Sequence, residues 1–449
     1  MAPLITWFGD DFTGSAATME VLAFAGLETV LFSDIPSPAL LERFTDAQAI
    51  GIASTARTHG PDWMRANLPA PFTFLHRLGA PLLHYKVCST FDSAPHSGNI
   101  GTAIEIGLKV TGAKAAPMIT GAPQMRRYQA FGHLFAGTFD GVFRLDRHPV
   151  MARHPVTPMD ESDLLRHLAA QTDLPSALID LEALWSGPEP ALDDALRDGA
   201  RILSIDSMDP ASELAAGRLI WQNVARLGFA VGSQGIEYAL VRHWQETGLI
   251  PPPATVPSAG PVAQIAAVSG SVSPITAQQI NWSAANGFEI IRFDAARAIA
   301  DPAVLSDEID KAIAAGVQAA AQGASPLICS ATGPDDPAVA AVRKALSLTG
   351  TRPEDANEMI GKALGRILDG ILTATGIRRA VISGGDTSGH GMRALGLEAL
   401  QALAPTIPGV SLCKAYGTGP HYGLEIALKG GQMGSADFFG WIREGGGAR

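Results

Sequence analysis

The chain has 449 residues, of which 47% are hydrophobic and 17% charged, and this excludes a disordered protein and allows two domains with separate cores. Its net charge of −11 argues against nucleic acid as a partner. We expect no membrane partner, because no apolar run reaches spanning length and no signal peptide opens the chain. Cys88, Cys329 and Cys413 lack metal-binding spacing, which favours a reducing, cytoplasmic location.

Strand-like and helix-like segments alternate from the N-terminus, which predicts an α/β fold with mostly parallel sheets. Strands are expected at residues 4–8, 29–32, 49–53, 82–87, 116–120, 177–180, 202–204 and 230–231. Helices are expected at residues 16–25, 61–78, 101–110, 160–171, 211–227 and 236–247. Residues 121–158 are predicted to form a long polar loop, whose cations would suit an acidic substrate: Arg126, Arg127, Arg144, Arg147, His148, Arg153 and His154. For most of them an ordinary solvated position is the simpler expectation.

A proline-rich connector at residues 251–261 predicts a domain boundary, with a first domain at residues 1–250 and a second at residues 262–449. The second series of strands is expected at residues 265–268, 289–293, 327–329, 380–382, 411–414 and 423–428. Its helices are expected at residues 275–286, 302–322, 357–375, 392–403 and 435–443. Open α/β sheets bind ligands at the carboxyl ends of their strands, so we expect two ligand sites that face one another across the interdomain cleft.

The first strand runs into Gly9-Asp10-Asp11-Phe12-Thr13-Gly14-Ser15. Two adjacent carboxylates repel one another unless a cation or the donors of a ligand neutralise them. This turn therefore predicts a ligand site in the first domain.

The second domain contains three turns rich in glycine or serine, at residues 269–273, 384–389 and 429–434. Glycine N–H groups, serine hydroxyls and Lys429 suit a triphosphate, although no Walker A sequence is present. Gly384 and Gly385 allow a ligand to approach the main chain, and a helix start after them would attract phosphate. Asp386 at such a place would hold Mg²⁺ or accept a proton. A capped strand–helix turn without a ligand is the alternative for this segment.

The chain resembles the four-carbon acid sugar kinases over nearly its whole length. The matching segments are Asp10-Asp11-Phe12-Thr13-Gly14, Arg57, Lys86 with Ser89-Thr90, Asn99-Ile-Gly101, His154-Pro-Val-Thr-Pro158, Gly270-Ser271 with Thr276 and Gln279, Gly384-Gly-Asp-Thr387, and Lys429-Gly-Gly431. Members of this family are two-domain α/β enzymes that phosphorylate threonate, erythronate and related acids with ATP. The resemblance implies that the first domain binds the acid sugar and the second binds ATP.

One segment departs from the family pattern. The family commonly reads Lys-x-Asp-Ser-Thr-Leu-Arg-Gly-Asn, whereas here Cys88 replaces the Asp, the Arg is missing and residues are inserted before Asn99. This variant is similar to the subgroup that acts on 3-oxo-isoapionate, a branched substrate.

The resulting hypothesis is an ATP-dependent kinase that phosphorylates a primary hydroxyl of a four-carbon or branched sugar acid, such as 3-oxo-isoapionate, 3-oxo-tetronate, threonate or erythronate. The acid-binding residues would be Asp10, Asp11, Arg57 (on the carboxylate), Lys86, Ser89 and Asn99. The Mg-ATP residues would be Ser269, Ser271, Gly384, Gly385, Asp386, Thr387, Lys429, Gly430 and Gly431, with Asp386 as metal ligand. Asp386 or Asp11 would accept the hydroxyl proton.

Three alternatives stay open at this point. Lys86 and Arg57 could be exposed ends of strands without a ligand. The protein could be a ribokinase-like sugar kinase, or a non-catalytic protein that binds acid sugars. The sequence is compatible with a monomer and with a homo-oligomer.

Overall fold

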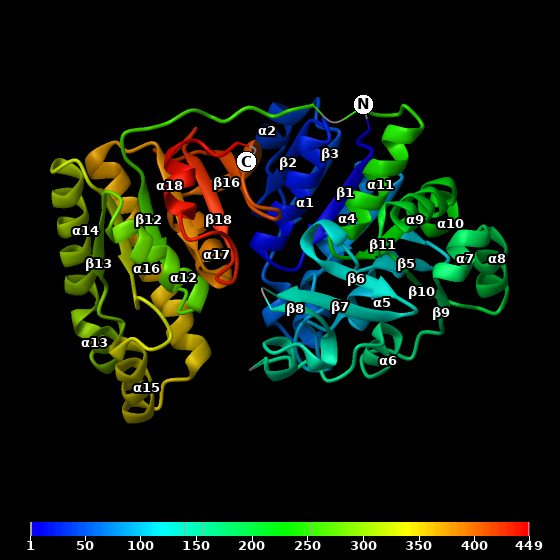
Figure 1. Ribbon diagram of the computed structural model, residues 1–449, viewed down its shortest axis with the longest axis horizontal. Helices are drawn as coiled ribbons and strands as arrows, with labels where there is room; N and C mark the ends of the chain where they lie inside the picture. Colours follow the sequence, from blue (N-terminus) through cyan, green and yellow to red (C-terminus); the bar gives the residue numbers. More distant parts are fainter. Residues whose placement is uncertain (1, 139, 155, 253, 448) are drawn as a thin grey trace. The chain divides into compact units, whose positions relative to one another are not determined.

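The computed structural model of the protein, shown in Figure 1, describes residues 2–138, 140–154, 156–252, 254–447 and 449, without the side chain of Asp386. The chain divides into two compact units, Met1–Ala254 and Thr255–Arg449, called here the N-terminal and the C-terminal unit. Each unit is built on a largely parallel sheet with helices packed against it, which confirms the predicted α/β class. No helix of the described chain is both long and apolar enough to cross a membrane.

The large sheet of the N-terminal unit has the strand order β2-β3-β1-β4-β11-β5-β10-β9, and its pairs are parallel. Its strands are β1 (Ile5–Gly9), β2 (Thr29–Phe32), β3 (Ala49–Ala53), β4 (Leu82–Lys86), β5 (Ala116–Ile119), β9 (Ser176–Ile179), β10 (Ile202–Ile205) and β11 (Phe229–Gly232). Its helices are α1 (Phe12–Phe24), α2 (Pro38–Leu41), α3 (Pro61–Asn67), α4 (Pro69–Arg77), α5 (Ile100–Thr111), α6 (Leu164–Ala169), α7 (Leu181–Ser186), α8 (Glu189–Arg197), α9 (Pro210–Gln222), α10 (Val224–Leu227) and α11 (Gly235–Glu246).

Residues 121–158 are not one long loop, and that prediction was wrong for much of the segment. They form a separate antiparallel sheet of β6 (Arg127–Ala130), β7 (His133–Thr138) and β8 (Gly141–Arg144), drawn in cyan in Figure 1. Gln129, which is fully buried, fixes β6 to the large sheet. Its side-chain amide donates to the Ser204 hydroxyl and the Ile205 carbonyl at the end of β10, and its oxygen accepts from the Thr120 N–H.

The C-terminal unit has the strand order β13-β14-β12-β15-β18-β17-β16, parallel except for the β16–β17 and β17–β18 pairs. Its strands are β12 (Ala266–Ser269), β13 (Phe288–Arg292), β14 (Ser325–Cys329), β15 (Arg379–Ser383), β16 (Leu397–Pro405), β17 (Ser411–Gly417) and β18 (Glu425–Lys429). Its helices are α12 (Pro274–Ala284), α13 (Ala295–Ala300), α14 (Leu305–Ala321), α15 (Pro337–Thr349), α16 (Pro353–Thr375), α17 (Gly385–Ala394) and α18 (Phe438–Arg443).

The helix expected at residues 392–403 was also a wrong prediction. Helix α17 ends at Ala394, and Gly396, at φ +63°, reverses the chain into strand β16. Leucine and alanine residues there suit a helix by local propensity, but pairing with β17 decides the outcome.

Candidate functional site

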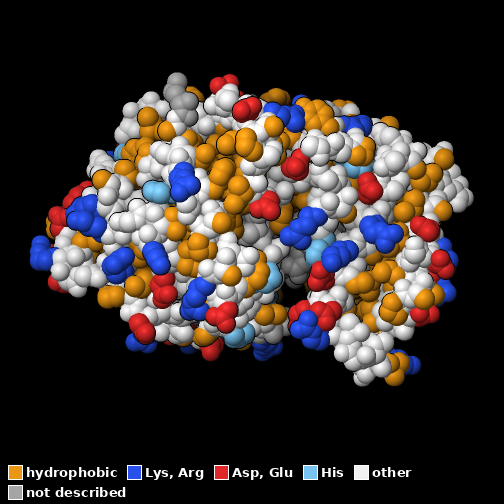
Figure 2. Space-filling model, turned by 180° about the vertical axis from the view of Figure 1, so that it is seen from behind, with side chains coloured by type: hydrophobic (Ala, Val, Ile, Leu, Met, Phe, Trp, Pro, Cys, Tyr) orange, Lys and Arg blue, Asp and Glu red, His pale blue; other side chains and the backbone are white. Residues whose placement is uncertain are grey.

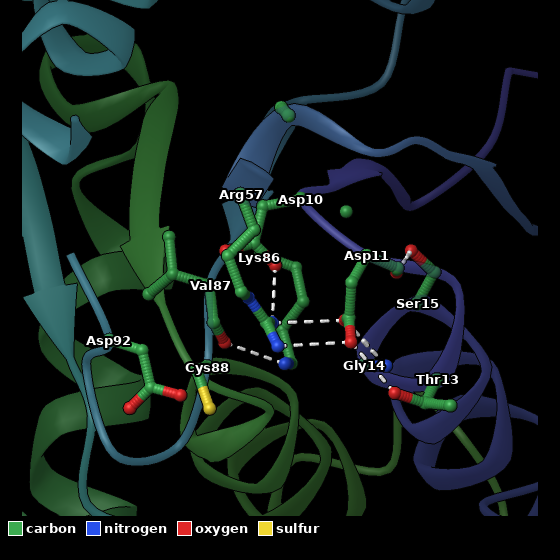
Figure 3. Close-up of polar contacts among 12 residues, drawn as sticks. Asp10, Asp11, Thr13, Gly14, Ser15, Arg57, Lys86, Val87, Cys88 and Asp92 are labelled. Carbon is green, nitrogen blue, oxygen red and sulfur yellow. Dashed lines mark hydrogen bonds and ion pairs between the residues drawn. The ribbon is translucent and has the colours of Figure 1, made fainter. Parts of the chain in front are cut away.

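Two carboxylates follow strand β1 and share one guanidinium. Arg57 lies in a single 3₁₀ turn, Ala56–Thr58, after the neighbouring strand β3. Its Nη2 and Nε donate to the two oxygens of Asp10 at 2.6 and 3.1 Å, and its Nη1 donates to Asp11 Oδ2 at 3.0 Å (Figure 3). The fork of Arg57 thus keeps the two carboxylates together at the carboxyl edge of the sheet.

Asp11 also caps helix α1. Its carboxylate accepts from the Gly14 N–H at 2.8 Å and from the Thr13 hydroxyl at 2.7 Å. Lys86 ends strand β4, in register with Gly9 of β1, and is 1% exposed. Its Nζ donates to the Val87 carbonyl at 2.6 Å (Figure 3). The ammonium also lies close to the start of α1, where a Cβ added to Gly14 would come within 2.9 Å of it.

The two carboxylates differ in pKa. Burial raises the pKa of Asp10 above its ordinary value and outweighs the opposing effect of Arg57. Burial acts in the same direction on Asp11, but Arg57 and Lys86 outweigh it there, so the pKa of Asp11 is lowered. Asp11 is therefore the carboxylate that the site keeps ionised, ready to accept a hydrogen bond from a ligand hydroxyl.

The segment after β4 forms a polar loop beside this cluster. The Thr90 hydroxyl donates to Asp92 Oδ1 at 2.7 Å and lies 3.1 Å from Cys88 Sγ. Burial, followed by the charge of Asp92, raises the pKa of Cys88 to about 11, so this position carries a neutral thiol. Ser89 is half-buried and has no hydrogen-bond partner among the residues that the structure describes.

Asn99 is placed differently from the other expected acid-binding residues. It is buried and caps helix α5, where its Oδ1 accepts from the Thr102 N–H at 2.7 Å and its Nδ2 donates to the Pro95 carbonyl at 3.1 Å. These bonds use its side chain to hold the inserted residues against α5. The structure thus brings together Asp10, Asp11, Arg57, Lys86 and residues 88–92, with Asn99 in a supporting position.

In the C-terminal unit the three predicted turns leave adjacent strands at one level. Ser269 of β12 is in register with Ser383 of β15, which is in register with Lys429 of β18. The following loops therefore emerge side by side at the carboxyl edge of the sheet. Sequence reasoning did not select Ser383, because its place opposite Ser269 depends on strand pairing.

A hydroxyl network ties two of these loops together. The hydroxyls of Ser273 and Thr276 both lie within hydrogen-bonding distance of the Gly431 carbonyl, and Thr276 Oγ1 also lies 3.0 Å from Ser271 Oγ. The hydroxyls of Ser269 and Ser383 are buried without a partner in the described structure. Unpaired buried hydroxyls are costly, which points to water or a ligand at this edge.

Lys429 is fully buried between these loops. Its Nζ donates to the carbonyls of Gly430 and Met433 at 2.8 and 3.3 Å, and no carboxylate forms an ion pair with it within the described chain. Burial lowers its pKa to about 7. An incoming anion would restore its charge.

Gly384 and Gly385 lie between β15 and α17. Gly384 precedes the helix at φ +132°, and its N–H donates to the Lys429 carbonyl at 2.8 Å. A Cβ on Gly385 would meet nothing within 4 Å, so the main chain is open to a ligand there. Thr387 is buried beside Gly384 and Gly270. Asp386 follows Gly385 in α17, and its side chain is outside the described residues.

The described residues contain no cluster of three or more His, Cys, Asp or Glu side chains able to hold a metal ion. The C-terminal edge offers hydroxyl oxygens instead, a donor set that fits Mg²⁺ bound mainly through nucleotide phosphates and water.

Family models match both units. A sugar-binding N-terminal domain matches residues 5–240, and a nucleotide-binding C-terminal domain matches residues 266–439. A 3-oxo-isoapionate kinase from Paraburkholderia graminis is 45% identical over 98% of this chain and 94% of the relative. A 3-oxo-tetronate kinase from Cupriavidus necator is 31% identical over 97% of this chain and 96% of the relative.

Two solved structures share the fold. A protein from Salmonella typhimurium LT2 superimposes with a TM-score of 0.78 at 24% identity, covering 98% of both chains. A protein from Haemophilus influenzae superimposes with a TM-score of 0.70 at 22% identity, covering 98% of this chain and 99% of the other.

Proposed function

The chain belongs to the four-carbon acid sugar kinase family, and on that premise we propose that it transfers the terminal phosphoryl group of ATP to a primary hydroxyl of a small acid sugar. The proposal depends on one observation: the domain type that matches each unit agrees with the polar residues at the carboxyl edge of its sheet. The unit that matches a sugar-binding domain holds the Asp10, Asp11, Arg57 and Lys86 cluster, and the unit that matches a nucleotide-binding domain holds three aligned serine, glycine and lysine loops.

In the N-terminal unit, Asp10, Asp11 and Lys86 would bind hydroxyls of the acid sugar. Arg57 holds both carboxylates at hydrogen-bonding distance, and the low pKa of Asp11 supports it as an ionised acceptor that orients the attacking hydroxyl. The half-buried Ser89 supplies a further hydroxyl, and Asn99 supports the loop through its cap.

In the C-terminal unit, the ATP phosphates would bind Ser269, Ser271, Gly384, Gly385, Thr387, Lys429, Gly430 and Gly431. A polyphosphate needs hydrogen-bond donors, and this edge offers the accessible main chain at Gly385, the unpaired hydroxyls of Ser269 and Ser383, and the buried amine of Lys429. Asp386 would be the carboxylate on Mg²⁺, which would offset phosphate charge during transfer. The hydroxyl oxygen bonds to the terminal phosphorus as the bond to the ADP oxygen breaks, and the proton passes to Asp11 or Asp386.

The preferred substrate would be an oxo or branched acid such as 3-oxo-isoapionate. Support comes from the 45% identity to a 3-oxo-isoapionate kinase and from the neutral thiol at Cys88. A thiol binds a hydroxyl poorly but leaves room beside a carbonyl or a branched carbon. We also propose a cytoplasmic location, where ATP is present and the thiols of Cys88, Cys329 and Cys413 stay reduced.

A panel of acids tests this function. ATP-dependent release of ADP is measured with 3-oxo-isoapionate, 3-oxo-tetronate, D-threonate and D-erythronate. We expect a higher kcat/KM for the oxo or branched acids, and Cys88→Asp should narrow that gap because a carboxylate accepts a sugar hydroxyl. Equal turnover of D-threonate by the wild type would contradict the substrate assignment, and no ADP release with any acid would contradict the kinase proposal.

A further inference from the structure

Arg127 is held at the same sheet edge as the acid-binding cluster. It begins β6, and its backbone pairs with Ala122, in the loop after β5, through hydrogen bonds of 2.9 and 3.2 Å. Lys86, Gly232 and Ile119 are in register across β4, β11 and β5. The loops after β4 and β5 therefore leave the sheet at one level, about 10 Å apart by the usual strand spacing.

The guanidinium of Arg127 is a half-buried cation that forms no ion pair within the described chain. Its Nη1 donates to the carbonyls of Met125, Arg126 and Gly137 at 3.2, 3.3 and 3.3 Å, while its Nε is buried and makes no hydrogen bond. Within the described chain no carboxylate forms an ion pair with it. A partly desolvated cation with a buried, unbonded Nε–H gains from an anionic partner, so an anion from outside the protein would fit here.

The cations of the neighbouring cluster already face carboxylates of the protein. Arg57 and Lys86 carry the two positive charges that face the carboxylates of Asp10 and Asp11. An acid sugar also brings a carboxylate of its own. The cations of that cluster are engaged by carboxylates of the protein, whereas Arg127 feels the charge of Asp92 but forms no ion pair in the described chain.

The surroundings of Arg127 connect it to the same ligand space. Asp92, on the loop after Lys86, and His148 interact electrostatically with it. His148 Nδ1 accepts from the N–H groups of Val150 and Met151, which leaves the proton of the neutral ring on Nε2. That N–H is a second donor, on a ring whose pKa is lowered by burial and then by the charge of Arg127.

We propose that Arg127, with the Nε2–H of His148 beside it, binds the carboxylate of the acid sugar and so selects acids over neutral sugars. The inference rests on the proposed function, because it names the group that recognises the acid of that substrate. Arg57 then acts on the acid indirectly, by holding Asp10 and Asp11.

The test compares the preferred acid of the panel with its primary amide, which has the same shape without the charge. In Arg127→Gln the preference for acid over amide in kcat/KM should fall by about 100-fold, as when one partner of a buried charge pair is lost. Arg127→Lys keeps the charge without the fork and should retain part of the preference. Arg126→Gln, on the same segment but exposed, should change the preference less than twofold.

Arg57→Lys should lower kcat/KM for acid and amide alike. If kcat/KM in Arg127→Gln fell equally for acid and amide, Arg127 would only hold the β6–β7 hairpin in place. If the glutamine variant does not fold, the same comparison is made with Arg127→Lys.

Calorimetry with the acid in the absence of ATP separates the two proposals. If the acid binds in this experiment but no acid of the panel gives ADP release when ATP is present, the kinase function is overturned and the Arg127 subsite stands. No binding by the wild type, or an unchanged Kd in Arg127→Gln, overturns the subsite.

Discussion

Arg57 shows how far a single residue can be interpreted from sequence. The sequence identified it as a functional cation, and the structure finds it bonded to Asp10, 47 positions away, and to Asp11. Residue type and position after a strand could be predicted, because polar side chains gather at the carboxyl edge of parallel sheets. Its partners could not, because they depend on β3 lying next to β1 in the sheet.

Asp386 and Asp10 belong to different steps of the proposed reaction. We expect Asp386→Asn to lower kcat by about 100-fold or more, since the amide neither holds Mg²⁺ as well nor accepts the proton. Asp10→Asn should mainly raise KM for the acid, because Asp10 helps to arrange the sugar-binding cluster. Steady-state kinetics with acid and ATP varied separately measure both effects. The reverse pattern would mean that the roles of the two units have been exchanged.

Lys429 should make ATP binding depend on pH. Its folded pKa of about 7 means that the ammonium form, which binds phosphate, prevails below pH 7 and is lost above it. The Kd for ATP should therefore rise by up to about tenfold between pH 6 and pH 8, as the charged fraction falls from roughly nine-tenths to one-tenth. Calorimetric titrations at both pH values test this. Lys429→Gln is the control, and an equally steep rise in that variant would assign the pH dependence to ATP itself.

At the scale of elements, the sequence predicted strands better than the connections between them. Residues 29–32 and 49–53 match β2 and β3, because a short apolar run between turn residues is typical of a strand that is buried on both faces of a parallel sheet. The helix expected at residues 61–78 is instead split into α3 and α4, since Pro69 can start a helix but interrupts one that is already running. Strands β6, β7, β8 and β16 form because they pair antiparallel with neighbouring segments of the chain, and such pairing overrides the local pattern on which the predictions rested.

The turn between β15 and α17 offers a direct test of the nucleotide site. In Gly385→Val the added Cβ meets nothing within 4 Å, so the variant should fold and lose ATP binding through blocked access to the main chain. Gly419→Val is the matched control, since its Cβ would also be unobstructed, with the Leu395 carbonyl 3.8 Å away. Calorimetry with ATP and thermal unfolding measure binding and fold separately. Unchanged ATP affinity in a folded Gly385→Val protein would remove this turn from the site.

At the scale of the whole molecule, both units begin with one topology. The first four strands of each large sheet lie in the order second, third, first, fourth: β2-β3-β1-β4 and β13-β14-β12-β15. In both units candidate residues lie at the carboxyl ends of the first and fourth strands. They are Asp10 and Lys86 in the N-terminal unit, and Ser269 and Gly384 in the C-terminal unit. This shared plan is why strand ends in the sequence were enough to propose a candidate site in each unit.

The overall charge of −11 gives no attraction for acid sugar or ATP. Figure 2 shows Lys and Arg side chains interspersed with Asp and Glu over the face in view. Under our two proposals, recognition of both anions would therefore depend on a few local cations, Lys429 in one unit and Arg127 in the other. Composition alone could not have identified them.

The thiol at Cys88 has a consequence for the chemical durability of the protein. Cysteines beside cations often become reactive thiolates, which oxidants and alkylating reagents attack. Here burial and Asp92 keep the pKa of Cys88 at about 11, so less than about 0.1% is thiolate at neutral pH. Cys329 is buried with a similarly raised pKa of about 11, and Cys413 is buried as well. We therefore expect that the sulfur atom of Cys88 does not make the kinase sensitive to peroxide or iodoacetamide.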